Sequence, residues 1–454
     1  MELHSPIYLL FLVACVAIMT VVKNRSGRML LFLGLSYGAY LSWSVTLLLL
    51  LVIVSLINFL MFRLLGRFHQ TWLIWLGVLV NLLILLSVRS LGTYMELVVI
   101  SGVLVPIGIS FYTLQGLGCL IDRYRGYGAN PSLLEFLVFM ALWPVVLAGP
   151  ICRLSEMLPQ FRQEYIQKIN WDGVRRIILG LFMKVVLADL LAQGPFGRGV
   201  NSGFDEIQFW SSTDVIILAF GYGFQLYFDF AGYSHIAIGS ALLVGIQLRE
   251  NFRTPFESSS PSEFWSRWHM SLSSWIRDYV FFPLATTWRG LGRHSLIVLG
   301  TMCVFGVWHG MATTFLIWGF YHGFLLIIQR FTERYSLLFF NVPSIVRWAV
   351  TFIFINLGWI FFRCDSLKQA LQMYKSLFSI WNPSSLEPSF QTIVLFMISA
   401  NMFLFLLRAR VQKWKKRSES QPFYQLLLPA GLAAVLLLTL AWGKSESPFV
   451  YVQF

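Results

Sequence analysis

The stretch EFWSRWHMSLSSWIRDY, Glu263–Tyr279, gathers an acid, two arginines, a histidine and an aspartate in a chain that is 57% hydrophobic. Before it, Ser260 and Pro261 have the pattern of a helix start, with Glu263 at the third helical position completing a capping box. At 100° per residue, the large apolar side chains fall within an arc of about 120°, and His269 falls about 20° outside it. The sequence therefore predicts one amphipathic helix that is too polar to cross lipid alone. The apolar arc consists of Phe264, Trp265, Trp268, Leu272, Trp275, Ile276 and Tyr279.

This predicted helix has two interpretations. It can lie in the membrane interface with its aromatic side in the acyl boundary, which makes His269 an incidental edge residue. It can instead pack inside the protein, with its polar face lining a wet cavity at membrane depth. The residues of the helix alone favour the interfacial interpretation, and the concentration of charged and titratable side chains keeps the cavity as the alternative.

The rest of the chain has the composition of a polytopic membrane protein. Only 12% of its 454 residues are charged, and it contains 41 Phe and 17 Trp. Apolar runs close to the length of about twenty residues that spans a bilayer recur from end to end. They predict an all-α integral membrane protein with about ten to twelve membrane segments, in one continuous domain over residues 1–454. Examples of these runs are Tyr8–Val22, Val45–Leu65, Trp72–Val88, Val346–Phe362, Thr392–Leu407 and Tyr424–Trp442.

The net charge of +13 lies mainly in short clusters beside these apolar runs, where Lys and Arg set membrane topology. Lys23, Arg25 and Arg28 follow the first run, and one consistent threading places this cluster and later ones on the cytoplasmic side. The cluster Arg408–Arg417 would then lie close to anionic lipid headgroups. This distribution indicates membrane lipid, and not nucleic acid, as the partner of the positive charge.

A second polar constellation is FGVWHGMATTFLIWGFYHGFLL, Phe305–Leu326, which is otherwise fit to span a bilayer. Imidazole at membrane depth is costly without a partner, so a histidine there is a candidate functional residue. Gly306 and Gly310 remove side-chain bulk around His309, which permits close approach by a substrate or simply by another helix. On one straight helix, His309 and His322 would be about 20 Å apart on faces differing by about 140°. We therefore expect His309 to be the functional residue and His322 to be structural.

The remaining polar residues give weaker indications. In YFDFAGYSHIAIG, Tyr227–Gly239, Asp229 and Tyr233 are one helical turn apart and could bond each other, most simply for structure. The five cysteines are scattered and show no metal-ligand spacing, so no metal site is predicted. Signatures of zinc proteases, nucleophile elbows and phosphate-binding loops are missing from the sequence.

Taken together, these motifs resemble the membrane-bound O-acyltransferase (MBOAT) family, and within it the bacterial alginate O-acetylation branch. FWSRWHMSLSSWIRDY and FGVWHG carry the resemblance, and further blocks extend it over nearly the whole chain. The resemblance implies a bundle of transmembrane helices, with shorter re-entrant or interfacial helices, around a central tunnel. One position departs from the family pattern, because His235 stands where related sequences tend to have an acid. The further blocks are PIGISFYTLQGLGCLIDRYRG, LAGPICRLSEMLPQF, LYFDFAGYSHIAIG, ENFRTPFESSSPSEFW, GWIFFR and SPFVYVQF.

The resemblance also implies residue roles. His309 matches the catalytic histidine of the family, and His269 matches a second, supporting one. Arg267, Arg277 and Asp278 match charged positions on the substrate side. The implied donor is acetyl-CoA from the cytoplasm, with no bound cofactor. The implied acceptor is a hydroxyl outside the cytoplasm, carried by a periplasmic partner protein that passes the acetyl group to an exopolysaccharide, so the expected location is the bacterial inner membrane.

The predicted chemistry suits these residues. Moving an acyl group from a thioester to a hydroxyl needs a base, and imidazole has a suitable pKa range. A donor for the developing oxyanion is also needed; Arg277, Trp308 or a backbone N–H is a candidate. Direct transfer with His309 as base is expected, with a short-lived acyl–histidine as an alternative. Two other functions stay open: D-alanyl transfer to a cell-wall polymer, and transport of a glycan or lipid without catalysis.

Overall fold

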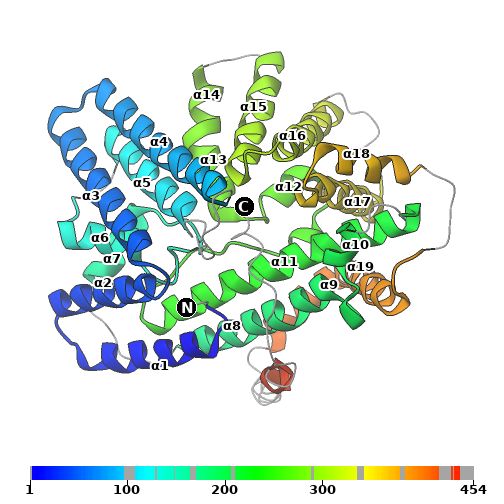
Figure 1. Ribbon diagram of the computed structural model, residues 1–454, viewed down its shortest axis with the longest axis horizontal. Coiled ribbons are helices and arrows are strands. Elements are labelled where there is room, and N and C mark those ends of the chain that lie inside the picture. Colours follow the sequence, from blue (N-terminus) through cyan, green and yellow to red (C-terminus); the bar gives the residue numbers. More distant parts are fainter. Residues whose placement is uncertain are drawn as a thin grey trace. The chain divides into compact units, whose positions relative to one another are not determined.

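The computed structural model is built from helices throughout the residues that it describes (Figure 1). These residues are 3–96, 108–127, 130–147, 149–163, 170–205, 210–287, 291–334, 342–378, 384–418, 431–432 and 434–439. Apart from the last few residues of the chain, they divide into two compact units. One unit comprises Met1–Gly180 and Tyr233–Glu250, and the other comprises Leu181–Gly232 and Asn251–Val450.

Six of the described helical segments are long and apolar enough to cross a membrane. A seventh apolar helix, α1 (Pro6–Val21), is shorter. The multi-pass class is thus confirmed, whereas the count of ten to twelve segments stays a prediction, and the run Tyr424–Trp442 lies mostly outside the described residues. The six segments are Val45–Phe68, Thr71–Val88, Trp171–Gly197, Ser212–Leu243, Ser344–Arg363 and Pro388–Arg408.

In the first unit, helices α3 and α4 are joined in their interior by a pair of buried amides. Asn58 and Asn81 each donate to the other's side-chain oxygen at 3.0 Å. A buried amide costs several kcal/mol if its hydrogen bonds are unmet, so this reciprocal pair fixes how the two helices face each other. The helices that begin in this unit are α1, α2 (Arg25–Leu41), α3 (Val45–Phe68), α4 (Thr71–Glu96), α5 (Ile109–Tyr124), α6 (Leu133–Ala141), α7 (Leu154–Arg162) and α8 (Trp171–Leu181).

The second unit contains the two sequence constellations. A π-helix, Phe182–Ala188, continues α8, and the long helix α11 (Ser212–Leu243) supplies its first part, up to Gly232, to this unit. The other helices of the unit are α9 (Asp189–Gln193), α10 (Val200–Asp205), α12 (Pro261–Trp265), α13 (Met270–Ile276), α14 (Phe282–Thr287), α15 (Leu291–His309), α16 (Thr313–Arg334), α17 (Ser344–Arg363), α18 (Leu367–Ser376) and α19 (Pro388–Ser418); short 3-10 turns occupy Pro195–Gly197 and Pro255–Glu257, and a second π-helix occupies Arg277–Phe281.

The prediction of one continuous helix over Glu263–Tyr279 is wrong. The helix start is as expected, because the hydroxyl of Ser260 accepts from the backbone N–H of Glu263 at 3.2 Å. However, α12 ends at Trp265, and His269 adopts a left-handed backbone conformation with φ 43° before α13 begins. The seven large apolar side chains assigned to the predicted arc are nevertheless all buried.

The predicted single segment Phe305–Leu326 is also broken. Helix α15 ends at His309, and α16 begins at Thr313 and runs back beside α15 (Figure 1). Two glycines allow this close packing. A Cβ atom on Gly306 would lie 2.2 Å from the carbonyl oxygen of Phe315, and one on Gly319 would lie 2.2 Å from that of Met302. Helix packing therefore accounts for Gly306.

Candidate active site

His309 lies at the last position of α15, where the partial negative charge of a helix C-terminus favours a basic side chain. Its side chain is only 3% exposed. Aromatic rings surround the imidazole, with ring-centroid distances between 4.8 and 5.3 Å. These rings belong to Phe305, Trp308, Trp318 and Phe362. An imidazole in such apolar surroundings is held in a defined orientation and is shielded from bulk water.

His269 is completely buried, so it is not the edge residue of an interfacial helix. Its Nδ1 atom lies 3.1 Å from the side-chain oxygen of Asn251. The ring packs edge-on against Phe230, at a centroid distance of 4.7 Å. His269 lies outside the six candidate spans, and burial lowers its pKa to about 3, so the imidazole is neutral at physiological pH.

The structure brings both candidate histidines to the same indole. The ring of Trp308 lies 4.8 Å from that of His309 and 6.3 Å from that of His269, measured between centroids. Trp308 thus connects two sequence motifs that are forty residues apart. His309, His269 and Trp308 form one aromatic cluster, which we call the His–Trp–His cluster.

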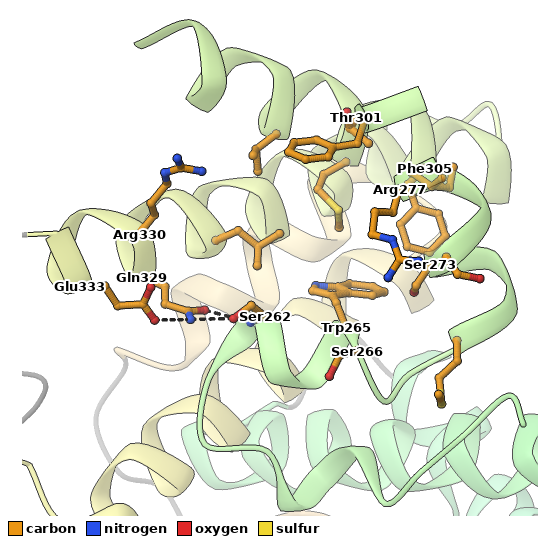
Figure 2. Close-up of a pocket in the computed structure, with 17 residues that line it drawn as sticks. Ser262, Trp265, Ser266, Ser273, Arg277, Thr301, Phe305, Gln329, Arg330 and Glu333 are labelled. Carbon is orange, nitrogen blue, oxygen red and sulfur yellow. Dashed lines mark hydrogen bonds between the residues drawn. The ribbon is translucent and has the colours of Figure 1, made fainter. Parts of the chain in front are cut away.

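A cavity of about 530 Å³ lies beside this cluster in the same unit. Its wall is mainly apolar and includes Trp265, Met302 and Phe305. Figure 2 shows Arg277 and Phe305 among the side chains of this wall, and a row of hydrogen bonds from Glu333 through Gln329 to Ser262 at another part of it. The cavity combines an apolar interior with charged groups, which suits an amphipathic ligand.

Two buried polar atoms among the cavity-lining residues are available to a ligand. The indole nitrogen of Trp265 and the hydroxyl of Thr301 have no hydrogen-bond partner among the residues that the structure describes. Trp265 is 8% exposed and Thr301 is 6% exposed. Because unmet buried donors are costly, a bound molecule that offers acceptor oxygens would be favoured here.

Aromatic rings separate the cavity from the histidines. Phe305 lines the cavity and also lies 5.1 Å from the ring of His309. Trp265 lines it and lies 5.2 Å from the ring of His322. Neither His309 nor His269 is among the residues that line this cavity. The ring of Phe305 therefore separates a ligand in the cavity from the imidazole of His309.

The three charged residues expected on the substrate side, Arg267, Arg277 and Asp278, do not all line the cavity. Arg277 lines the cavity and forms an ion pair with Asp278 at 2.8 Å. Arg267 forms an ion pair with Glu263 at 2.6 Å and lies 3.3 Å from the hydroxyl of Thr254. Of the three, only Arg277 is part of the cavity wall. The bonds of Arg267 instead connect α12 to the preceding loop.

His322 lies on α16 and is fully buried. Trp318 contacts both His322 and His309, at centroid distances of 4.9 and 5.3 Å. Neither ring nitrogen of His322 has a hydrogen-bond partner among the described residues. The break between α15 and α16 thus places the two histidines around one tryptophan, an arrangement that a single straight helix would not allow.

Two buried polar residues of the second unit were missed by sequence reasoning. Lys184 pairs with Asp229 at 2.7 Å and lies 3.6 Å from Asp189, with both Lys184 and Asp229 only 1% exposed. A lysine inside an otherwise apolar run was the available signal. Asn251, the partner of His269, has no comparable local signal, because asparagine is common in loops. Among the described residues, no group of three metal-binding side chains lies together.

Comparisons with known proteins agree with this architecture. The fold defines a multi-pass helical membrane protein with a buried histidine pair. The family model "MBOAT, membrane-bound O-acyltransferase family" matches residues 32–367, which include both histidines. The chain therefore belongs to the membrane-bound O-acyltransferase family, and the resemblance predicted from the motifs is confirmed.

The chain is similar to proteins that are named as three different kinds of acyl-transfer enzyme. The chain is 37% identical to the probable alginate O-acetylase AlgI of Pseudomonas syringae pv. tomato, over 73% of this chain and 64% of that protein. It is 33% identical to the peptidoglycan O-acetyltransferase of Helicobacter pylori, over 56% of this chain and 57% of that protein. It is 31% identical to the teichoic acid D-alanyltransferase of Bacillus subtilis, over 56% of this chain and 68% of that protein. The matched regions thus span between about half and two thirds of these relatives.

Proposed function

We propose that the chain is a membrane O-acyltransferase that moves an acetyl group from cytoplasmic acetyl-CoA to a hydroxyl outside the cytoplasm. The acceptor is carried by a partner protein of an exopolysaccharide O-acetylation pathway in the bacterial inner membrane. The observation that carries the proposal is the His–Trp–His cluster, in which two buried imidazoles of the family-matched region meet at Trp308. A pair of buried imidazoles beside a cavity suits proton transfer between an acceptor hydroxyl and a leaving group.

In this proposal His309 is the general base. It takes the proton of the acceptor hydroxyl as that oxygen attacks the thioester carbonyl carbon. The carbon–sulfur bond then breaks, and the proton passes from the imidazolium to the leaving thiolate, so that an ester and free CoA are formed. The developing oxyanion needs a donor, and the indole N–H of Trp308 and the guanidinium of Arg277 are the candidates.

The cavity is the proposed place of the acyl donor. Arg277 and Arg330 are cationic groups that can attract the phosphates of CoA, while the apolar wall suits the acyl end. The N–H of Trp265 and the hydroxyl of Thr301, which have no hydrogen-bond partner in the part of the chain that the structure describes, are suitable for carbonyl oxygens of the pantetheine arm. Because Phe305 separates this cavity from His309, its ring must turn aside for the thioester to reach the base.

A His309→Ala variant tests the function. The purified variant should insert and fold but release no CoA from acetyl-CoA in the presence of acceptor, whereas the wild-type protein should. His69→Asn, an exposed helix-capping histidine far from both motifs in sequence, is the matched control and should retain turnover. Undiminished CoA release by His309→Ala would refute the role of this residue.

The B. subtilis relative makes D-alanyl transfer the second candidate. Donor choice separates the two functions: turnover with a D-alanyl carrier protein and not with acetyl-CoA would favour D-alanyl transfer. Flux of a glycan or lipid through proteoliposomes without any acyl donor would favour transport instead. The matches to O-acetylases over a larger share of the chain support the acetyl donor.

A further inference from the structure

The helix break at His269, between α12 and α13, comes from a short pairing of two chain segments. The backbone N–H of Arg253 donates to the carbonyl of Arg267 at 3.0 Å, and the N–H of Met270 donates to the carbonyl of Asn251 at 2.8 Å. These bonds hold the segment before α13 against the loop that follows residue 250. They account for the left-handed conformation of His269, which costs of order 1–3 kcal/mol in a residue other than glycine.

The side chain of Asn251 lies at the centre of this pairing. Its carbonyl oxygen lies 3.3 Å from the backbone N–H of Ser271, 2.9 Å from the hydroxyl of Ser271 and 3.1 Å from Nδ1 of His269. Asn251 and His269 are both fully buried, and Ser271 is 3% exposed. The network is therefore protected from exchange with bulk water.

These contacts determine which amide atom faces the histidine. A backbone N–H can only donate, so the Asn251 atom that faces Ser271 must be the oxygen and not the amide nitrogen. The same oxygen faces Nδ1 of His269. Since that oxygen can only accept, Nδ1 must carry a hydrogen and donate it.

A neutral imidazole carries one hydrogen on its two ring nitrogens. With that hydrogen on Nδ1, the lone pair of His269 resides on Nε2, which can accept a hydrogen bond or a proton. The alternative tautomer would place the Nδ1 lone pair against the oxygen of Asn251, two acceptors facing each other at 3.1 Å. The observed geometry excludes that arrangement on electrostatic grounds.

We propose that Asn251 is a positioning residue that holds His269 in the Nδ1–H tautomer, so that the Nε2 lone pair is kept available as a hydrogen-bond acceptor while His309 acts as the base in acyl transfer. This inference rests on the proposed function for its catalytic consequence, but the tautomer can be tested without turnover. The rings that face His269 are Phe230, Phe252 and Trp308, at centroid distances of 4.7, 6.4 and 6.3 Å, and they are uncharged. Asn251, held in turn by Ser271, therefore orients a ring that also packs against these aromatic side chains.

The direct test is nitrogen-15 NMR of the purified full-length protein labelled at histidine, with the His269 signals assigned by their loss in His269→Asn. We expect a protonated Nδ1 and an unprotonated Nε2 at neutral pH. An Nε2–H tautomer for His269 would overturn the inference, whatever the enzyme activity.

Substitutions of Asn251 test the consequence. Asn251→Asp keeps an acceptor against Nδ1 and should retain the Nδ1–H signal and measurable turnover. Asn251→Leu removes the acceptor, and should release the tautomer and lower kcat by about 10²-fold or more. Asn356→Leu, which removes another fully buried asparagine of the same unit, is the control for loss of buried polar contacts and should leave the His269 signals unchanged.

The outcomes separate the two proposals. If the Nδ1–H signal is present in the wild type and released in Asn251→Leu while kcat stays unchanged, the positioning role is wrong and the proposed function stands. If the signal is as expected but the wild-type protein releases no CoA from any acyl-CoA with acceptor present, the proposed function fails and the tautomer assignment stands. If Asn251→Leu does not fold, Asn251→Asp decides: loss of its Nδ1–H signal contradicts the inference.

Discussion

Lys184 and Asp229 form an ion pair of 2.7 Å in the interior of the second unit, where each side chain is only 1% exposed. Asp189 lies 3.6 Å from the same ammonium group. Both Lys184 and Asp229 belong to helices that can cross the membrane. Removing the ammonium by Lys184→Met should therefore destabilise the protein by about 3–5 kcal/mol, because buried carboxylates lose their opposite charge.

Thermal unfolding in detergent measures this effect. Lys184→Met should lower Tm strongly, and adding Asp229→Leu should recover much of the loss, since replacing a buried ion pair by apolar residues is often nearly neutral. Lys368→Met, at an exposed position of α18, is the matched control and should change Tm little. Equal Tm values for Lys184→Met and Lys368→Met would contradict a structural role for the ion pair.

Glycines of α15 give a second prediction, because two of them differ in their surroundings. A Cβ atom on Gly306 would lie 2.2 Å from the carbonyl oxygen of Phe315, whereas one on Gly300 would have nothing within 4 Å. Gly306→Ala should force α15 and α16 apart, lowering Tm and also displacing His309, which should reduce turnover. Gly300→Ala should leave Tm unchanged or raise it slightly, by about 1 kcal/mol or less in stability. Identical effects of the two substitutions would show that the helices do not pack as described.

Phe305 gives a third prediction, because its ring is shared by the cavity wall and the surroundings of His309. Phe305→Ala should open the cavity towards His309 and let longer acyl groups reach this base. The ratio of kcat/KM for butyryl-CoA to that for acetyl-CoA should rise by roughly tenfold or more. Phe281→Ala enlarges the same cavity at a ring that is not among those around His309, and should leave the ratio nearly constant. A constant ratio in Phe305→Ala would argue against the cavity as the donor site.

Glu135 gives a prediction for pH dependence outside the membrane spans. The Arg162 guanidinium bonded to this carboxylate at 2.9 Å lowers the pKa of Glu135 from 4.5 to about 2, and Arg25 contributes a further contact. Because the folded-state pKa is the lower one, the stabilisation is present above about pH 4.5 and is lost as pH falls towards 2. Glu135→Gln should therefore have a lower Tm than wild type at pH 7.

The difference in Tm between wild type and Glu135→Gln should shrink progressively as the pH falls below 4.5. Asp365→Asn is the control, because that carboxylate is 83% exposed and lies 3.9 Å from its arginine. Its Tm should follow that of the wild type across the same range. A Tm difference for Glu135→Gln that does not change between pH 7 and pH 3 would rule out this linkage.

Some features of this protein could be predicted from its sequence alone. The frequent long apolar runs require helices in a membrane, because lipid leaves backbone groups no partner except within the chain. The helix start at Ser260 follows from capping, which acts over a few neighbouring residues. The motif blocks around His269 and His309 were sufficient to indicate the family.

Other features were decided only by the tertiary structure. The left-handed turn at His269 arises from pairing with Asn251 and Arg253, and no local pattern in Glu263–Tyr279 predicts it. The ion pair of Lys184 with Asp229 joins two helices that are distant in sequence. The turn between α15 and α16 brings His309 and His322 into contact with the same ring, that of Trp318. The physical reason is common to all three: periodicity and propensity describe interactions within one helix, whereas hydrogen bonds, charges and ring contacts between segments override them once the segments meet.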